Sequence, residues 1–330
     1  MGNENQTLGQ SMIRLFMGYI PTRVIYVAAK LELTDNIGDN GASAQDLAQK
    51  LELDPAALYR VLRVLAGLGV LRQDESERFF VTPFGDTLRK DSPQSVRDYA
   101  IYSHEIVYDS FKTITDSVRT GKPGMNDLFG FLRANPQQEA IFHAGMSNRG
   151  RIETAAILEA YKFLDSKTVV DVGGGNGGFL SAILARHTHL SAMLFDQISA
   201  IEAAKAGLGG PLPRCTLMAG DFFDNVPSDG DTYLLKRVLF DWTDEEALRI
   251  LKNCRRAMNS DTRLLIIEPL IGAPNEQCPA HLFDMTLLVM LHGRLRTADE
   301  YSGLLSQAGF RLQRVVPTGS DVSILEAFVA

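Results

Sequence analysis

Several features that mark other protein classes are scarce in this sequence of 330 residues, and each scarcity excludes something. Cysteine occurs only three times, at widely spaced positions, so neither a disulfide framework nor a zinc-ligand pattern is present, and a reduced, cytoplasmic location is expected. The histidines show no metal-ligand spacing beyond His187 and His189, which we expect to cap a helix end or face solvent. We therefore predict no metal site.

Positive charge and long apolar runs are scarce as well. The formal net charge is −7, whereas a general nucleic-acid-binding protein usually carries a basic face. No apolar run approaches the roughly 20 residues of a membrane helix. The first residues have neither the basic start nor the apolar core of a secretory signal. The sequence therefore predicts no nucleic-acid partner and no membrane partner.

Residues 169–178 contain a β-branched run that ends in a glycine-rich turn and continues as a helical segment. This is the strand–loop–helix pattern of a nucleotide-binding α/β domain, in which glycines such as Gly173 and Gly175 let the backbone approach a ligand closely. The turn lacks the Gly-x-x-x-x-Gly-Lys-Ser/Thr pattern of a phosphate-binding loop. An adenosine that carries no phosphate therefore fits this turn better.

Two acidic residues follow at positions where the next two strands of such a domain would end. Asp196 closes the apolar run 192–195, where a carboxylate can accept hydrogen bonds from ribose hydroxyls. Asp221 follows the run 215–220, and Phe222 beside it can cover the face of an adenine ring. Together they predict an adenosine-containing cofactor.

Strands and helices alternate from about residue 167 onward, which is typical of a parallel sheet. Further strands are predicted at 232–236 and 263–268, and an antiparallel pair at 309–312 and 323–328 is predicted to complete the sheet. We therefore expect an α/β, Rossmann-like domain.

The N-terminal part is mostly helical and carries the pattern of a winged helix. Ser43 and Asp54 are predicted helix caps, and Pro55 occupies a first helical position. Leu71 and the run 79–82 predict the two strands of a small wing. A DNA-binding regulator is thus an alternative, although its second helix offers little to read bases or bind phosphates.

The motifs together resemble the S-adenosylmethionine-dependent O-methyltransferase family, which includes plant caffeate- and flavonoid-type enzymes and bacterial enzymes that methylate antibiotics and pigments. The matching residues are 171–177, 196, 220–222, 234–242 and 267–269. The resemblance covers nearly the whole chain, and segment 226–235 is particularly similar to the bacterial branch that N-methylates phenazine carboxylates.

This resemblance implies a class I methyltransferase domain over residues 161–330, a winged-helix-like dimerisation domain over 1–100, and a helical linker over 101–160 that supplies pocket walls. It implies a homodimer that binds S-adenosylmethionine and a small aromatic substrate. It also implies three further residues at the cofactor site, Lys236, Ser147 and Trp242.

The chain departs from the family pattern at the catalytic base. The family uses a histidine before Asp-Trp, oriented by two glutamates, whereas this chain has Phe240 before Asp241. Glu268 matches the first glutamate, and Leu295 occupies the position of the second. Since phenylalanine cannot accept a proton, histidine-assisted O-methylation is not expected.

Three interpretations of this departure remain open. In the first, which we favour, the acceptor needs no general base because it is a ring nitrogen, an electron-rich carbon or an ionised oxygen. In the second, the base has moved to Asp241, Glu268, His104 or His292. In the third, the bound cofactor serves a cyclisation or rearrangement without methyl transfer. The sequence thus predicts an enzyme that methylates a small aromatic or heteroaromatic secondary metabolite, as in antibiotic biosynthesis.

Overall fold

The protein is represented by a computed structural model that describes residues 7–125, 128–207 and 213–330. The chain divides into two compact units, each with its own hydrophobic core. The first unit is Met1–Asp109 with Leu132–Arg149, and the second is Ser110–Phe131 with Gly150–Ala330. The predicted linker, residues 101–160, is thus divided between the two units.

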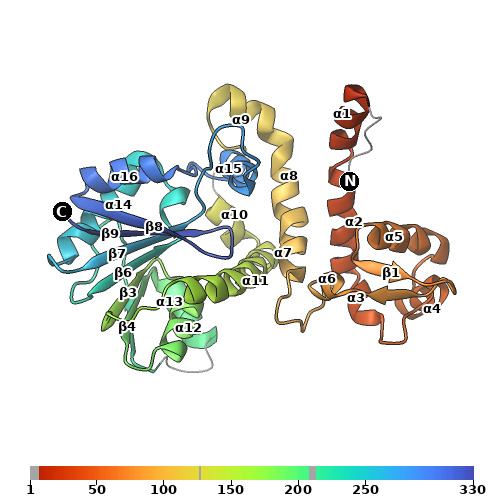
Figure 1. The fold of residues 1–330 in the computed structure, drawn as a ribbon, viewed down its shortest axis with the longest axis horizontal. Coiled ribbons are helices and arrows are strands. Elements are labelled where there is room, and N and C mark those ends of the chain that lie inside the picture. The colour runs from red at the N-terminus through yellow and green to blue at the C-terminus, as the bar shows by residue number, and fades with distance from the viewer. Residues whose placement is uncertain (1–6, 126–127, 208–212) are drawn as a thin grey trace. The chain divides into compact units, whose positions relative to one another are not determined.

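The second unit is built on a seven-stranded sheet with the order β5-β4-β3-β6-β7-β9-β8 (Figure 1). Its strands are β3 Thr168–Val172, β4 Ser191–Asp196, β5 Cys215–Ala219, β6 Thr232–Lys236, β7 Arg263–Glu268, β8 Phe310–Pro317 and β9 Ser323–Val329. Strands β3 to β7 pair in parallel, whereas β9 is antiparallel to both β7 and β8. This arrangement confirms the predicted Rossmann-like domain and its antiparallel pair.

Alternate side chains of each central strand enter two different cores, one on each face of the sheet, because strand side chains have a period of two. On β3, Val170 and Val172 pack with α14 and α16, while Val169 packs with α11, α12 and α13. These helices are α11 Pro136–Ala160, α12 Gly178–Arg186, α13 Ile198–Gly207, α14 Asp244–Ala257 and α16 Ala298–Gln307. The carboxyl ends of the parallel strands are therefore left to form the site.

The first unit contains a small helical core and a two-stranded hairpin. Its main elements are α1 Leu8–Phe16, α2 Tyr19–Lys30, α3 Leu33–Asn36, α4 Ala44–Leu51, α5 Pro55–Gly67, β1 Leu71–Gln73, β2 Phe79–Val81, α6 Pro83–Asp86, α7 Arg97–Tyr102 and the π-helix η1 Ser103–Val107. The side chains of Ser43 and Asp54 accept hydrogen bonds from the first turns of α4 and α5, which confirms both predicted caps. β1 and β2 form the expected antiparallel wing.

The short remaining elements connect these parts. They are α8 Tyr108–Ser110, η2 Phe111–Thr113, α9 Ile114–Thr120, α10 Leu128–Ala134, η3 Leu239–Asp241 and α15 Pro279–Met290. Of these, η3 and α15 carry side chains of the site described below in the second unit.

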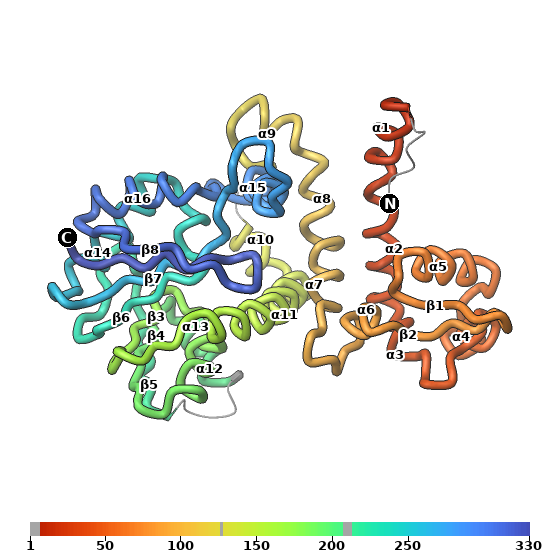
Figure 2. Tube along the Cα trace, viewed as in Figure 1, coloured from red at the N-terminus to blue at the C-terminus, as the bar shows by residue number. Residues whose placement is uncertain are grey.

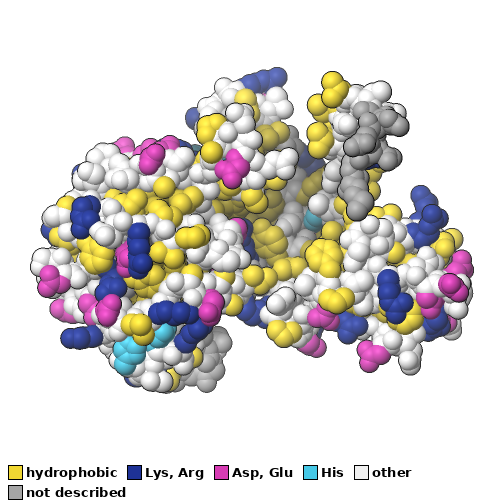
Figure 3. Space-filling model, viewed as in Figure 1, with side chains coloured by type: hydrophobic (Ala, Val, Ile, Leu, Met, Phe, Trp, Pro, Cys, Tyr) yellow, Lys and Arg dark blue, Asp and Glu magenta, His cyan; other side chains and the backbone are white. Residues whose placement is uncertain are grey.

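Helices α1 and α2 follow each other along the chain (Figure 2). Most of their apolar side chains lie outside the core of their unit. The segment Leu8–Lys30 is long and apolar enough to cross a membrane, although the sequence had led us to expect no such run. Arg14 and Arg23 interrupt its apolar residues, and length and composition alone are weak evidence for a membrane span, so the expectation is not overturned. Figure 3 shows hydrophobic side chains standing on α1, where Leu15 and Phe16 are exposed.

Candidate cofactor and acceptor site

The glycine-rich turn lies directly after β3, and its shape depends on Gly173. This residue has a φ of +73°, in the left-handed region that favours glycine. A Cβ atom at Gly173 would lie 2.9 Å from Val238 and 3.5 Å from the ring of Phe222. The turn is therefore brought against the two later segments that carry Phe222 and Val238.

Asp196, at the end of β4, is fixed by the same turn. Its carboxylate accepts hydrogen bonds from the backbone N–H groups of Gly175, at 2.7 Å, and Gln197, at 2.6 Å. Burial raises the pKa of Asp196 above its ordinary value, although these two hydrogen bonds oppose the shift. The predicted ribose-binding carboxylate and the predicted glycine turn thus meet in one place.

Asp171 is a buried acid that sequence reasoning included in the turn motif but did not single out. It is 1% exposed, and neither carboxylate oxygen has a hydrogen-bond partner among the residues that the structure describes. Burial raises its pKa to about 7, opposed by the nearby charge of Lys236. A Cβ atom at Gly174 would lie 2.5 Å from its carboxylate, so this acid sits directly beneath the turn. A bound cation would satisfy it.

Lys236, at the end of β6, is already paired within the chain. Its Nζ lies 3.2 Å from the carboxylate of Glu153, which is almost fully buried on α11. Arg237 binds the same carboxylate with two nitrogens, at 2.7 to 3.0 Å. Arg237 also has a φ of +55°, a strained value for a side-chain-bearing residue, and the bidentate pair holds it there. The predicted cofactor role of Lys236 stays a prediction.

An aromatic cluster of Phe222, Phe223 and Trp242 contains two residues predicted to contact the cofactor, Phe222 and Trp242. The indole of Trp242 packs edge-on against Phe223, at 4.7 Å between ring centroids, and against Phe222 at 6.0 Å. Asp221 is exposed and accepts a hydrogen bond from the N–H of Phe223. The structure thus brings together the predicted residues of the adenine side.

The position of the missing histidine is occupied by a packed apolar pair. Phe240, on η3, lies in one buried cluster with Leu295, and its ring meets Phe283 of α15 edge-on at 5.6 Å. A Cβ atom at Gly293 would collide with the backbone of Phe240 and Asp241. His292, next to Gly293, is exposed, and a catalytic role for it stays a prediction.

Glu268 is fully buried at the end of β7 and is bound to the backbone. One carboxylate oxygen accepts hydrogen bonds from the N–H groups of Val238 at 3.1 Å, Leu239 at 2.6 Å and Phe240 at 3.3 Å. The hydroxyl of Tyr301 donates to the other oxygen. Burial raises the pKa of Glu268 to about 8. Glu268 therefore anchors the turn that presents Phe240.

Asp241 is the half-buried neighbour of Phe240. Burial raises its pKa to about 7, and the charge of Arg237 opposes that shift. Such a carboxyl group has the protonation range of a general base, but no contact among the described residues assigns it that task. Its predicted role stays a prediction.

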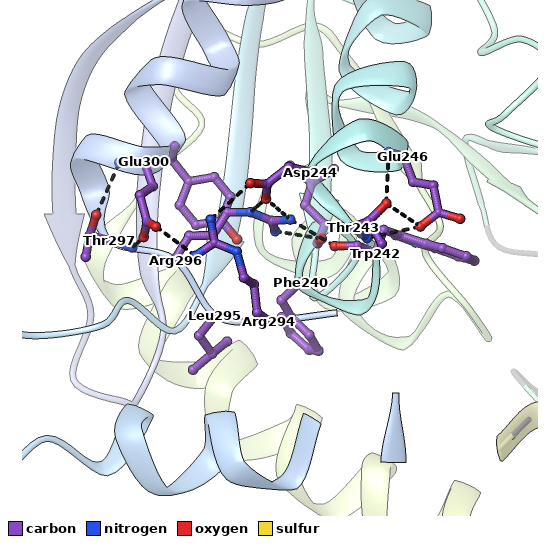
Figure 4. Close-up of polar contacts among 12 residues, drawn as sticks. Phe240, Trp242, Thr243, Asp244, Glu246, Arg294, Leu295, Arg296, Thr297 and Glu300 are labelled. Carbon is purple, nitrogen blue, oxygen red and sulfur yellow. Dashed lines mark hydrogen bonds and ion pairs between the residues drawn. The ribbon is translucent and has the colours of Figure 1, made fainter. Parts of the chain in front are cut away.

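Arg296 was not among the residues selected from the sequence, yet it contacts the same turn (Figure 4). It is fully buried and donates to the carbonyl oxygens of Leu239 at 2.9 Å and Trp242 at 2.8 Å. Its Nε also donates to Asp244 at 2.8 Å. Only the run 294–297 hinted at it, by placing two arginines beside the apolar Leu295.

Ser147 and His104 belong to the first unit, whereas the glycine turn and Phe240 belong to the second. Ser147 is exposed on α11. His104 lies on η1, with its ring stacked 5.2 Å from Tyr26 and 5.7 Å from Tyr108. Burial lowers the pKa of His104. The roles predicted for both residues stay predictions.

Comparisons with known proteins agree with this architecture. An O-methyltransferase domain model matches residues 111–311, and an O-methyltransferase dimerisation domain model matches residues 13–91. Phenazine O-methyltransferase PhzM of Lysobacter antibioticus is 37% identical, over 97% of this chain and 96% of the relative. Phenazine-1-carboxylate N-methyltransferase of Pseudomonas aeruginosa is 30% identical, over 99% of each chain.

A solved structure extends the similarity to three dimensions. CalO1, a methyltransferase in calicheamicin biosynthesis in its SAH-bound form, has a TM-score of 0.89 and 32% identity, and the match covers 99% of this chain and all of that one. The two domain models together match most of the chain, residues 13–91 and 111–311. This chain therefore belongs to the O-methyltransferase family.

Proposed function

We propose that this protein transfers the methyl group of S-adenosylmethionine to a ring nitrogen, an electron-rich carbon or an already ionised oxygen of a small aromatic natural product. The observation that carries the proposal is the apolar pair Phe240 and Leu295, packed where the family has its histidine and second glutamate. Neither side chain can accept a proton. An acceptor that needs no proton removed fits this wall.

The cofactor is S-adenosylmethionine, and the residues at the glycine turn fit it. The carboxylate of Asp196, bound to the N–H of Gly175, supports a role in binding the ribose hydroxyls, and the carboxylate of Asp171, which has no hydrogen-bond partner among the described residues, suits a molecule that carries positive charge. When bound, this cofactor supplies a methyl group on a sulfonium that a nucleophile can displace in line. The protein's own part is to hold the two reactants in register and exclude water.

The acceptor wall favours a flat, apolar ring system. Phe240, Phe283 and Leu295 offer aromatic and aliphatic surface, against which a heteroaromatic ring can pack. The two phenazine methyltransferases among its relatives carry names that fit such a substrate. We extend the proposal to a bacterial biosynthetic role in the cytoplasm, with no nucleic-acid or membrane partner.

The dimerisation-domain match supports a homodimer. The alternative of a DNA-binding regulator finds no support, because the winged-helix-like region falls within that match. The non-methylating alternative is likewise unsupported, since the relatives compared above are named methyltransferases.

The test uses two probe acceptors, phenazine-1-carboxylate and a hydroxyphenazine, with S-adenosylmethionine in excess. We expect release of S-adenosylhomocysteine with one methylated product, whose methylated atom is assigned by NMR. For the hydroxyphenazine, the rate should rise with pH only as the free phenol ionises. Rapid methylation well below the phenol's own pKa would require a base and would contradict the proposal.

A further inference from the structure

We propose that Arg296 is a positioning residue for the methyl acceptor, because it fixes the turn that carries Phe240. The inference rests on the proposed function, in which Phe240 forms part of the acceptor wall. Neither the family match nor the sequence pattern assigns Arg296 a role, and the structure gives it one through backbone contacts.

Arg296 supplies side-chain donors to the carbonyl side of the turn, where the Leu239 carbonyl also accepts from the N–H of Trp242. Its two terminal nitrogens reach the carbonyls of Leu239 and Trp242, which flank Phe240 and Asp241 along the chain. A guanidinium presents several donors in a rigid plane, so one side chain can hold two carbonyls at a set spacing. The lysine ammonium also has three donors, but it stands on a flexible stem and lacks the rigid fork that fixes the spacing of two carbonyls.

The amide side of the same turn is held by Glu268. Its carboxylate takes the N–H groups of three consecutive residues, Val238, Leu239 and Phe240. Glu268 thus binds the N–H groups of the turn, and Arg296 binds its carbonyl oxygens. We call these two side chains the clamp. Tyr301 contacts both side chains. Its hydroxyl donates to Glu268, and its ring centroid lies 5.7 Å from the Arg296 guanidinium.

The clamp reaches the acceptor wall through two neighbours. Leu295, next to Arg296, packs in the same cluster as Phe240. The backbone N–H of Leu295 donates to Asp284 of α15 at 2.7 Å, which ties this segment to the helix that carries Phe283. A shift of Arg296 would thus move both halves of the apolar pair.

The chain supplies a matched control in Arg294. It binds the same Asp244, at 3.0 Å, and Glu300 at 2.7 Å, but its side chain is 45% exposed and its described contacts are with side chains (Figure 4). Replacing Arg294 therefore removes an arginine–Asp244 pair without removing a donor from the turn. Exposed pairs of this kind contribute little to stability.

The experiment compares Arg296→Lys and Arg296→Met with Arg294→Lys and Arg294→Met, using phenazine-1-carboxylate as the probe acceptor. We expect Arg296→Met to raise the KM for the probe by about tenfold, because the displaced wall binds the acceptor less well. The KM for S-adenosylmethionine should stay within about twofold, and Arg296→Lys should be intermediate. Both Arg294 variants should match the wild type.

A second readout does not need an acceptor. Trp242 is the only tryptophan of the chain, and its carbonyl is bound by Arg296. In the cofactor-bound enzyme, we expect acrylamide to quench the fluorescence of Trp242 more strongly in Arg296→Met than in the wild type. Arg294→Met should leave the quenching unchanged. This readout also serves if Arg296→Met folds poorly, because Arg296→Lys can be measured in its place.

The outcomes separate the clamp from the proposed function. An equal rise in both KM values, or no change in either, would overturn the positioning role. If the wild type methylates neither phenazine probe, the proposed acceptor class is wrong. The acrylamide quenching of Trp242 then tests by itself whether Arg296 fixes the turn. Unchanged quenching in both Arg296 variants would refute it.

Discussion

At the scale of single residues, the replacement of the histidine is accommodated by a second replacement. A glutamate at position 295 would lie buried among Phe240, Leu287 and Ala280, and with no histidine beside it the charge would be unpaired. Burying such a charge without a partner is costly. Leucine at 295 avoids that cost, so the two apolar residues form one unit of packing rather than two independent changes.

A double substitution tests this pairing. We expect Phe240→His alone to leave the affinity for S-adenosylmethionine within about twofold and to add little activity on a hydroxyphenazine below its pKa, because Leu295 replaces the second glutamate that would orient the imidazole. Phe240→His with Leu295→Glu should raise that activity by about tenfold or more. Calorimetry and product release measure the two effects, with Phe240→Leu as the control. Loss of cofactor binding in Phe240→His would argue against the placement of this residue.

Asp171 makes a prediction about pH. Burial raises its pKa to about 7, so it gains charge as the pH rises through that value. If that charge helps to hold the cationic cofactor, affinity should increase from pH 6 to pH 8 by up to about tenfold. Asp171→Asn should bind more weakly and lose most of this dependence. Calorimetric titrations at each pH give the answer, and an equally steep profile in Asp171→Asn would contradict it.

At the scale of elements, local chemistry was enough to predict some boundaries, although β8 runs over Phe310–Pro317, five residues beyond the predicted end at 312. β6 and β7 begin and end where the sequence predicted, since β-branched and leucine runs are bounded by turn residues. The caps at Ser43 and Asp54 also depend only on residues three positions away.

The turn that carries Phe240 could not be predicted in the same way. Glu268 lies about thirty residues from the amides it binds, and Arg296 more than fifty from its carbonyls. Such contacts depend on how the loops after β6 and β7 meet in space, which periodicity does not encode. The resemblance supplied Glu268 as a catalytic candidate but not the backbone bonds that occupy it.

Glu268 should therefore affect the turn more than the cofactor. We expect Glu268→Ala to lower turnover more than it weakens S-adenosylmethionine binding, because the freed amides belong to the acceptor side. Steady-state kinetics and calorimetry test this, with Glu268→Gln as the shape-matched variant. A parallel loss of turnover and cofactor affinity would show that the turn serves both.

The buried carboxyl group of Glu268 also makes the stability of the fold depend on pH. Its pKa is raised from 4.5 to about 8, so the folded protein retains a proton that the unfolded chain releases. The contribution of Glu268 to stability should then fall as the pH rises through this window. Urea denaturation between pH 5 and 8 should show a shallower decline for Glu268→Gln than for the wild type. Identical slopes would contradict the shift.

Gly293 is the tightest packing point of this region. An added Cβ would collide with the Phe240 carbonyl and the Asp241 backbone, neither of which can swing aside as a side chain does. Gly293→Ala should therefore lose about 2 kcal/mol or more of unfolding free energy. Gly303→Ala on α16 is the control, since its Cβ would meet no described atom within 4 Å and should be neutral or stabilising.

At the scale of the whole molecule, the apolar N-terminal helices predict how the chain associates. Leu15 and Phe16 are 72% and 69% exposed within a dimerisation-domain match, so burial against a second copy is expected. Leu15→Glu with Phe16→Glu should shift the protein from dimer toward monomer in sedimentation velocity. Val118→Glu changes a similarly exposed residue of α9 and should leave the dimer intact.

The strand order has a consequence for the newly made chain. β8 precedes β9 in sequence, but β9 is its neighbour in the sheet and also the neighbour of β7. During synthesis, β8 therefore has no neighbouring strand to pair with until residues 323–329 have left the ribosome and formed β9 between β7 and β8. A translational pause or a premature stop before those residues would expose both β7 and β8, and would make this stretch the natural target of a chaperone.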